Sequence, residues 1–94
     1  MGTYIMLSRL TEHGAETLKK NSGRVQEVNK ELSGMGVKVL QQYAVLGAYD
    51  FVNVVDAPDL ATVMRASVTM GARGSVRIET LAALPMEEFV KAVR

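Results

Sequence analysis

An α+β fold follows from the way strand-like and helix-like patterns alternate along this chain. Residues 3–9 alternate loosely around an apolar run, and residues 37–46 form a second strand-like segment, with Val37, Val39, Gln41 and Tyr43 expected on one face. Residues 48–55 and 75–84 are further apolar segments, and the stretch between them repeats its apolar residues every three or four positions. We expect these elements to form one domain, residues 1–94.

The first helical region is interrupted. Thr11 is a candidate N-cap because its side-chain oxygen can accept a backbone hydrogen bond. Gly23 weakens the helix by about 1 kcal/mol relative to alanine, and the apolar spacing resumes after it. We therefore expect either one bent helix or a short helix followed by a longer one, ending near Gly34.

The second half of the chain repeats this arrangement. Gly47 predicts a tight turn that makes 37–46 and 48–55 antiparallel neighbours. Pro58 ends the third strand and suits the first turn of the next helix. One face of that helix is predicted to be buried. The residues of this face are Leu60, Val63, Met64, Ser67, Val68 and Gly71.

Pro85 starts a short closing helix, which we expect to pack on the body through Phe89, Val90 and Val93. The resulting order is β-α-β-β-α-β with a terminal helix, which is the ferredoxin-like order. It predicts a four-stranded antiparallel sheet with its helices on one face.

The strand predicted at 48–55 is apolar on both faces. Side chains alternate along a strand, so Tyr49, Phe51 and Val55 are expected on one face, and Val52 and Val54 on the other. A strand of this kind needs cover on both sides, and one layer of helices supplies only one. The sequence therefore predicts self-association, as a homodimer or a larger homo-oligomer.

Composition excludes several classes of function. The net charge is +1 and the basic residues are dispersed, so we expect no nucleic-acid partner. Cysteine is absent, which excludes disulfides, thiolate catalysis and cysteine metal sites. No apolar run approaches the roughly 20 residues of a membrane helix, and the apolar start is too short for a signal peptide. We expect a cytoplasmic protein without a membrane partner.

Asp50 and His13 are the candidate catalytic residues. A buried carboxylate has a raised pKa unless an arginine or backbone donors hold it, and such groups often act as acids or bases. Asp50 is either such a group or a strand-start aspartate that bonds the turn at Gly47 or pairs with a base such as Arg77. His13, the one histidine, is either a solvated surface group or a proton-transfer group.

Tyr49 and Asn53 are expected on one face of their strand, and Tyr4 and Tyr43 can join them from neighbouring strands. Such side chains line either a small polar-tipped pocket or a dimer interface. Arg77 either faces solvent or clamps an anionic ligand. The predicted ligand-binding residues are Tyr49, Asp50, Asn53 and Arg77.

The sequence carries no motif that predicts a cofactor or a metal ion. It has no GxGxxG or GxxxxGK[ST] loop for a nucleotide, and no GxSxG elbow for a nucleophilic serine. HxxxH spacing, which is typical of metal sites on helices, is absent as well. We expect no cofactor and no metal site.

The segment 47–59 resembles the signature of the GYD domain family. In that family a G-x-Y-D-x-V strand leads into an E-A-P-D turn, which here reads Gly47-Ala48-Tyr49-Asp50, Val52 and Asp56-Ala57-Pro58-Asp59. Further matches follow in order: Thr11 and Gly14, Arg24, Gly74, Val76, Arg77 and Thr80, and Glu87-Glu88-Phe89. The chain departs from the family pattern at Asp56, Gly23 and Leu84.

The resemblance implies a fold similar to the dimeric α/β-barrel group, in which two ferredoxin-like sheets face each other. The family is largely without assigned function, and related barrels include isomerases, monooxygenases, haem enzymes and ligand-sensing modules. A fold does not choose among these activities.

Three hypotheses stay open at this point. The first is an oligomeric protein that binds a small molecule. The second is a cofactor-free enzyme, isomerase-like or monooxygenase-like, for a small aromatic or anionic metabolite, with Asp50 as acid or base and Tyr49, Asn53 and Arg77 orienting the substrate. The third is a pure assembly or regulatory module.

Overall fold

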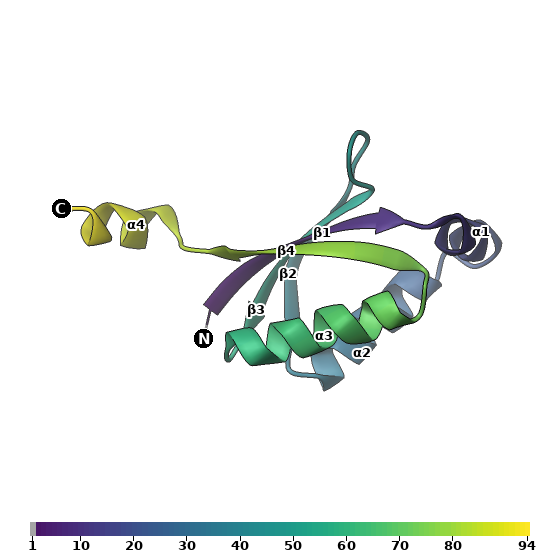
Figure 1. Ribbon diagram of the computed structural model, residues 1–94, viewed down its shortest axis with the longest axis horizontal. Helices are drawn as coiled ribbons and strands as arrows, with labels where there is room; N and C mark the ends of the chain where they lie inside the picture. The colour runs from purple at the N-terminus through teal and green to yellow at the C-terminus, as the bar shows by residue number, and fades with distance from the viewer. Residues whose placement is uncertain (1) are drawn as a thin grey trace.

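A computed structural model describes residues 2–94 of the chain (Figure 1). The strands are β1 (Gly2–Leu10), β2 (Lys38–Ala44), β3 (Phe51–Ala57) and β4 (Val76–Ala83). The helices are α1 (Glu12–Lys20), α2 (Arg24–Gly34), α3 (Leu60–Ala72) and α4 (Met86–Ala92). The predicted order of elements is confirmed, with the first helical region divided into α1 and α2.

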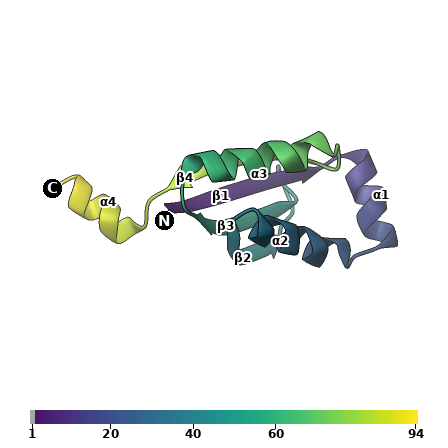
Figure 2. The same ribbon diagram turned by 90° about the horizontal axis from the view of Figure 1, so that it is seen from below.

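The four strands form one antiparallel sheet in the order β2-β3-β1-β4. Helices α2 and α3 lie side by side on one face of this sheet, and α1 lies beyond the end of β1 (Figures 1 and 2). We call the side of the sheet that carries α2 and α3 the helix-covered face, and the other side the open face. The predicted α+β fold, with a four-stranded antiparallel sheet, is confirmed.

The core lies between the helix-covered face and the two helices. Its buried apolar residues are Tyr4, Met6, Leu32, Val37, Val55, Ala57, Val63, Ala66 and Met70. Side-chain alternation places Phe51 and Val55 toward the helices and Val52 and Val54 toward the open face, as predicted.

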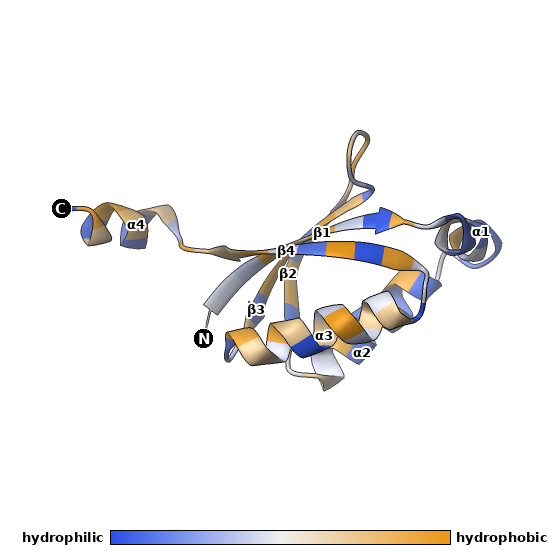
Figure 3. Cartoon of the chain, viewed as in Figure 1, coloured by the Kyte–Doolittle hydropathy of each residue, from blue (hydrophilic) through white to orange (hydrophobic). Residues whose placement is uncertain are grey.

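The open face carries apolar side chains that no described element covers. Ile5 of β1 lies between Val54 of β3 and Leu81 of β4, and Leu7 pairs with Val52. Along the first half of β4, hydrophobic positions alternate with hydrophilic ones (Figure 3). This alternation puts Val76 and Ile78 on the helix-covered face and Arg77 and Glu79 on the open face. Leu81 is exposed, whereas Ile5, Leu7, Val52 and Val54 are half-buried.

The connection between β2 and β3 differs from the predicted tight turn. Residues 45–50 form a hairpin loop that projects away from α2 and α3 (Figure 1), closed by a hydrogen bond from the Val45 N–H to the Asp50 carbonyl at 2.8 Å. Gly47 at its tip has φ of +137°, a backbone conformation that favours glycine. Tyr49 therefore lies in the loop, and the prediction that it belongs to the strand is wrong.

A β-bulge changes the faces of β2. The register with β3 shifts between Val39 and Gln41, so Val39 packs against the core while Gln41 and Tyr43 lie on the open face. The four residues Val37, Val39, Gln41 and Tyr43 do not share a face as a regular alternation predicts.

Helix α3 is apolar on two sides. Val63, Ala66 and Met70 face the core. Leu60, Met64 and Val68, which the 3–4 spacing placed in the same buried face, are exposed. A spacing of three or four residues does not separate these two neighbouring stripes, because residues at that spacing lie only roughly on one side of a helix.

Helix α4 extends away from the body beyond the end of β4 (Figures 1 and 2). Phe89, Val90 and Val93 are exposed, so the prediction that they pack back on the body is wrong. The Cα radius of gyration is 14.0 Å, whereas a compact chain of this length has about 12 Å. Leu84 and Pro85 connect β4 to α4.

Candidate functional site

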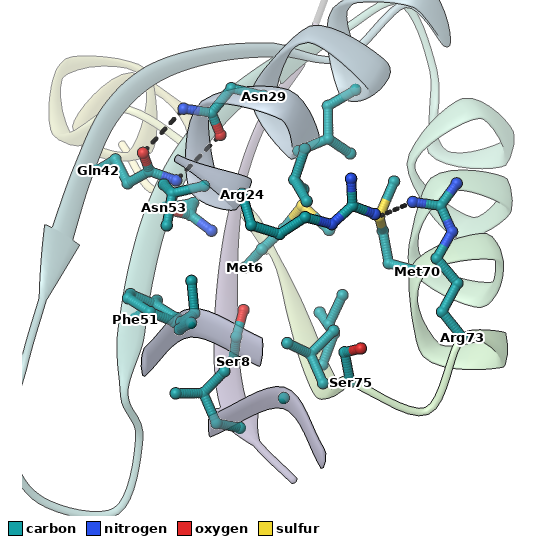
Figure 4. Close-up of a pocket in the computed structure, with 18 of the residues that line it drawn as sticks. Met6, Ser8, Arg24, Asn29, Gln42, Phe51, Asn53, Met70, Arg73 and Ser75 are labelled. Atoms are coloured by element: carbon teal, nitrogen blue, oxygen red, sulfur yellow. Dashed lines mark hydrogen bonds between the residues drawn. The ribbon is translucent and has the colours of Figure 1, made fainter. Parts of the chain in front are cut away.

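A cavity of about 120 Å³ lies between the helix-covered face of the sheet and helices α1, α2 and α3 (Figure 4). Its walls are mainly apolar. They include Met6 and Ile78 from the sheet, Leu18 from α1, and Val28 and Leu32 from α2. It opens to solvent on one side and reaches the core of the fold at Met6, Leu32 and Met70.

Asn53 of β3 is one of two buried polar residues that line this cavity, the other being Ser8 of β1. Asn53 is 8% exposed, and its Oδ1 has no hydrogen-bond partner among the described residues. Gln42, opposite it in the sheet register, is already engaged with Asn29 of α2 through two hydrogen bonds of 2.9 and 3.1 Å (Figure 4). An amide is therefore held on a rigid strand with its carbonyl oxygen unsatisfied.

Two arginines line the rim of the cavity and are both paired with Glu31. Arg24 contacts Glu27 at 2.8 Å and Glu31 at 3.5 Å, and Arg73 donates a hydrogen bond to Glu31. The hydrogen bond from Arg73, helped by the positive charges of both arginines, lowers the pKa of the Glu31 carboxyl. This ion-pair group joins α2 to the end of α3.

The signature loop makes a second polar group on the opposite side of the sheet. The Tyr49 hydroxyl donates to the Glu79 carboxylate, and the Arg9 guanidinium lies 4.9 Å from the centre of the Tyr49 ring. Arg9 Nε also donates to the Ala48 carbonyl at 2.8 Å. The hydrogen bond to Glu79 raises the pKa of Tyr49. These contacts fold the loop over one end of the open face.

Asp50 is bound to the end of β1. Its Oδ2 accepts from the Leu10 N–H at 2.8 Å, and its own N–H donates to the Ser8 carbonyl at 2.8 Å. The side chain is half-buried. The recorded partner of the carboxylate is therefore a backbone amide of β1, rather than the turn at Gly47 or Arg77.

The predicted site residues divide between the two faces. Asn53 faces the cavity, whereas Tyr49 contacts residues of the open face, so the prediction that the two share a face is wrong. Tyr4 is in the core and Tyr43 is exposed on the open face, and they form no cluster with Tyr49. Tyr49 lies in a loop, where strand alternation does not apply.

The remaining predicted residues lie at the surface. Arg77 is exposed and lies across from Arg9 in the β1–β4 register. His13 is exposed in the first turn of α1. Neither lines the cavity.

Sequence reasoning missed Asn29 and Ser8, which also line the cavity. Asn29 stands four residues after Val25 and three before Leu32, so it interrupts the apolar face of α2. A polar residue at a buried helical position was a usable signal. Ser8 ends the alternation of β1 and gave no comparable signal.

Between residues 2 and 94, no group of three or more His, Cys, Asp or Glu side chains is placed to hold a metal ion. No helix in this range is long and apolar enough to cross a membrane.

The sequence matches the family model of the GYD domain over residues 4–93. The chain belongs to the GYD domain family. It is 54% identical, over the full length of both chains, to the glutamine synthetase and cystathionine beta-lyase binding protein of Thermus thermophilus. It also resembles the crystal structure of TTHA0845 from the same organism, with a TM-score of 0.55, 28% identity, and coverage of 90% of this chain and 95% of the other.

The GYD motif residues Thr11 and Gly14 join α1 to the start of β4. Thr11 Oγ1 accepts from the Gly14 N–H at 3.1 Å and donates to the Gly74 carbonyl at 2.6 Å. A Cβ atom on Gly14 would lie 2.0 Å from the Ser75 carbonyl oxygen. Glycine is required here because the helix backbone touches the backbone of the residue that precedes β4.

Proposed function

We propose that this GYD protein is a binding protein that self-associates and docks on a metabolic enzyme. The observation that carries the proposal is that apolar side chains lie without cover among the described residues on the open face, on the outer side of α3 and, apart from it, on α4. A full-length relative at 54% identity is named for binding two enzymes, glutamine synthetase and cystathionine beta-lyase. We place this activity in the cytoplasm.

The open face is the surface that we assign to a second copy of the chain. Ile5, Leu7, Val52 and Val54 form a contiguous apolar centre through the β1–β3 register. Two such faces packed against each other bury apolar area on both sheets, which contributes roughly 25 cal/mol per Å². This pairing gives β3 the cover on its second side that the sequence demands.

The outer surface of α3 and α4 is the surface that we assign to the enzyme partner. Leu60, Met64 and Val68 are exposed on α3, and Phe89 and Val93 on α4. A helix that is apolar on more than one side is normally buried. Because α3 lies across the sheet from the open face, its outer stripe stays accessible when two open faces pair.

The two surfaces can be tested separately. The purified chain would be titrated against immobilised glutamine synthetase and cystathionine beta-lyase from the same host, and its mass measured by light scattering. Met64→Lys should weaken enzyme binding at least tenfold without changing the oligomer. Val54→Glu should dissociate the oligomer, because it buries a charge in an apolar face.

Ala61→Ser, an exposed change on the same helix, is the matched control and should alter neither property. Absence of binding to both enzymes at micromolar concentrations would refute the proposed partner class. A wild-type chain that stays monomeric at those concentrations would refute self-association through the open face.

Small-molecule binding is a second candidate function, which the mainly apolar cavity between the sheet and helices α1, α2 and α3 favours. A cofactor-free enzyme that uses Asp50 as acid or base has less support. The Asp50 carboxylate is engaged by the Leu10 amide and does not line the cavity. An acid–base group must reach the reacting atoms of its substrate.

A further inference from the structure

The open face carries opposite charges at its two ends. Arg9 lies two positions after Leu7 on β1, and Arg77 is opposite Arg9 in the β1–β4 register, so both guanidinium groups belong to one end of this face. Asp56 lies two positions after Val54 on β3, at the other end, beside the start of β1. The apolar centre of the open face therefore separates two arginines from a carboxylate.

The two arginines have no carboxylate partner in the part of the chain that the structure describes. The ion pairs shorter than 4.0 Å between residues 2 and 94 all involve Arg24 or Arg73. Arg9 and Arg77 are like charges directly opposite each other on neighbouring strands, an arrangement that destabilises a sheet. Their end of the open face therefore lacks a counter-charge.

Two further charged side chains lie on this face. Glu79 stands near the arginines and accepts a hydrogen bond from the Tyr49 hydroxyl, and two positive charges with one negative charge leave this end at +1. Lys38 is opposite Asp56 in the β2–β3 register, so their charges sum to zero, but within the described chain they form no ion pair shorter than 4.0 Å. The Asp56 carboxylate is therefore free to accept from a second copy.

These charges distinguish the two ways in which aligned sheets can face each other. Sheets that pack face to face commonly keep their strand directions within about 30° of each other. If matching ends met, four arginines would gather at one end of the interface. If opposite ends met, each arginine pair would lie near Asp56 of the second copy. Like charges in contact oppose an interface and complementary ones set its register, so the charges favour opposite ends.

The hairpin loop 45–50 favours the same arrangement on steric grounds. It projects away from α2 and α3, and its contacts with Arg9 and Glu79 place it at the arginine end of the open face (Figure 1). Leu46, beside its tip, is fully exposed. Two such loops at one end of an interface would hold the sheets apart, whereas loops at opposite ends leave room for the sheets to pack.

We propose that two copies of the chain pair their open faces with β1 of one antiparallel to β1 of the other, so that Arg9 and Arg77 of each copy contact Asp56 of the second copy. The proposal rests on the self-association proposed above and specifies the orientation and the polar contacts of that interface. Each contact occurs twice, because a two-fold interface uses the same surface on both subunits.

A distance between two spin labels tests the orientation. Because the chain contains no cysteine, one introduced cysteine carries a label at a single known position. Leu46→Cys puts this label on the loop, outside the apolar centre of the interface. The two labels of a dimer should lie at least about 30 Å apart, the length of the nine-residue β1 at 3.3 Å per residue. Pulsed electron double resonance on the full-length chain measures this distance.

An exchange of charges tests the contacts. Arg77→Glu should raise the dissociation constant of the dimer at least about tenfold, because it brings a carboxylate to Asp56 of the second copy. Arg77→Glu combined with Asp56→Arg reverses both charges and should restore dimer formation. Lys19→Glu, the same change of charge on the exposed surface of α1, is the matched control and should leave the dissociation constant unchanged. Sedimentation velocity over a range of concentrations measures it.

The outcomes separate the orientation from self-association itself. Suppose that Val54→Glu dissociates the dimer but the labels lie clearly closer together than the length of β1. The open-face dimer would then stand and its antiparallel orientation would be overturned. A folded, exchanged variant that stays dissociated would overturn the contacts between the arginines and Asp56. The label distance needs neither charge variant to fold. A wild-type chain that stays monomeric at micromolar concentrations would refute self-association, and the orientation with it.

Discussion

The two faces of the sheet differ in the burial and hydrogen bonding of their polar side chains. On the helix-covered face, Asn53 is buried with an unsatisfied oxygen. On the open face, Tyr49, Arg9 and Glu79 are paired with one another near solvent. The buried oxygen has no donor among the described residues, whereas the paired surface groups position a loop. The difference shows that the signature loop and the cavity are separate parts of the molecule.

Neighbouring residues of β1 provide the strongest test of this contrast. Met6 is 2% exposed in the core, and Leu7 points to the open face. Met6→Ala should lower the free energy of unfolding by about 2–5 kcal/mol at any protein concentration, because it leaves a cavity. Leu7→Ala should cost more at high than at low concentration, because its cover comes from a second copy. Denaturant unfolding at two protein concentrations measures both, and equal losses from Leu7→Ala at each would contradict the contrast.

Gly14 supports the helix-covered face through a backbone contact. Gly14→Ala should lower the free energy of unfolding by about 1–3 kcal/mol, since the new Cβ would lie 2.0 Å from the Ser75 oxygen. Gly71→Ala, in a helix with open space around it, should instead raise it by up to about 1 kcal/mol. Thermal unfolding of the two variants checks the difference, and a stabilising Gly14→Ala would refute the close contact.

Asp50 connects the loop to β1, and its removal tests whether its role is structural. Asp50→Ala should lower the free energy of unfolding by about 1–3 kcal/mol, because the Leu10 N–H loses its acceptor. Asp50→Asn keeps an acceptor oxygen and should lose less. Urea unfolding of both variants measures the effect, and a wild-type stability for Asp50→Ala would show that the hydrogen bond is not needed.

The smallest expected changes concern the pH dependence of the free energy of unfolding, which should differ between the two faces of the sheet. Glu31 has a lowered pKa, so its contribution is complete above its ordinary value of 4.5 and is lost as the pH falls through the lower folded value. Tyr49 has a raised pKa, so its contribution is complete below its ordinary value of 10.0 and is lost as the pH rises through the higher folded value.

Glu31→Gln should therefore flatten the acid side of a melting-temperature profile, and Tyr49→Phe the alkaline side. A change on the opposite side of the profile in either variant would show that the assigned hydrogen bonds do not control these pKa values.

Much of the fold could be predicted because its signals are local. The predicted cap at Thr11 formed, with its side chain accepting from the Gly14 amide. Pro58 lies before the first turn of α3, and Asp59 caps that helix by accepting from the Thr62 amide. The alternation of β3 placed Phe51 and Val55 opposite Val54 because strand geometry depends on adjacent residues alone.

The site was less predictable, because it depends on contacts between distant parts of the chain. Asn53 and Asn29 line one cavity although they come from different elements, β3 and α2. The two faces of α3 could not be told apart, since spacing alone does not show which stripe meets the sheet. The bulge in β2 and the extended placement of α4 likewise have no local signature.

By itself, the sequence determined the α+β class, the order of elements, the GYD family and the need for cover on both faces of β3. Only the tertiary structure decided that Tyr49 and Asn53 lie on opposite faces, that Asp50 is held by the Leu10 amide, and that a cavity surrounds Asn53. The physical reason is the distance along the sequence over which each kind of interaction acts. Periodicity and capping arise between residues a few positions apart, whereas a cavity and a docking surface arise from the way distant elements pack.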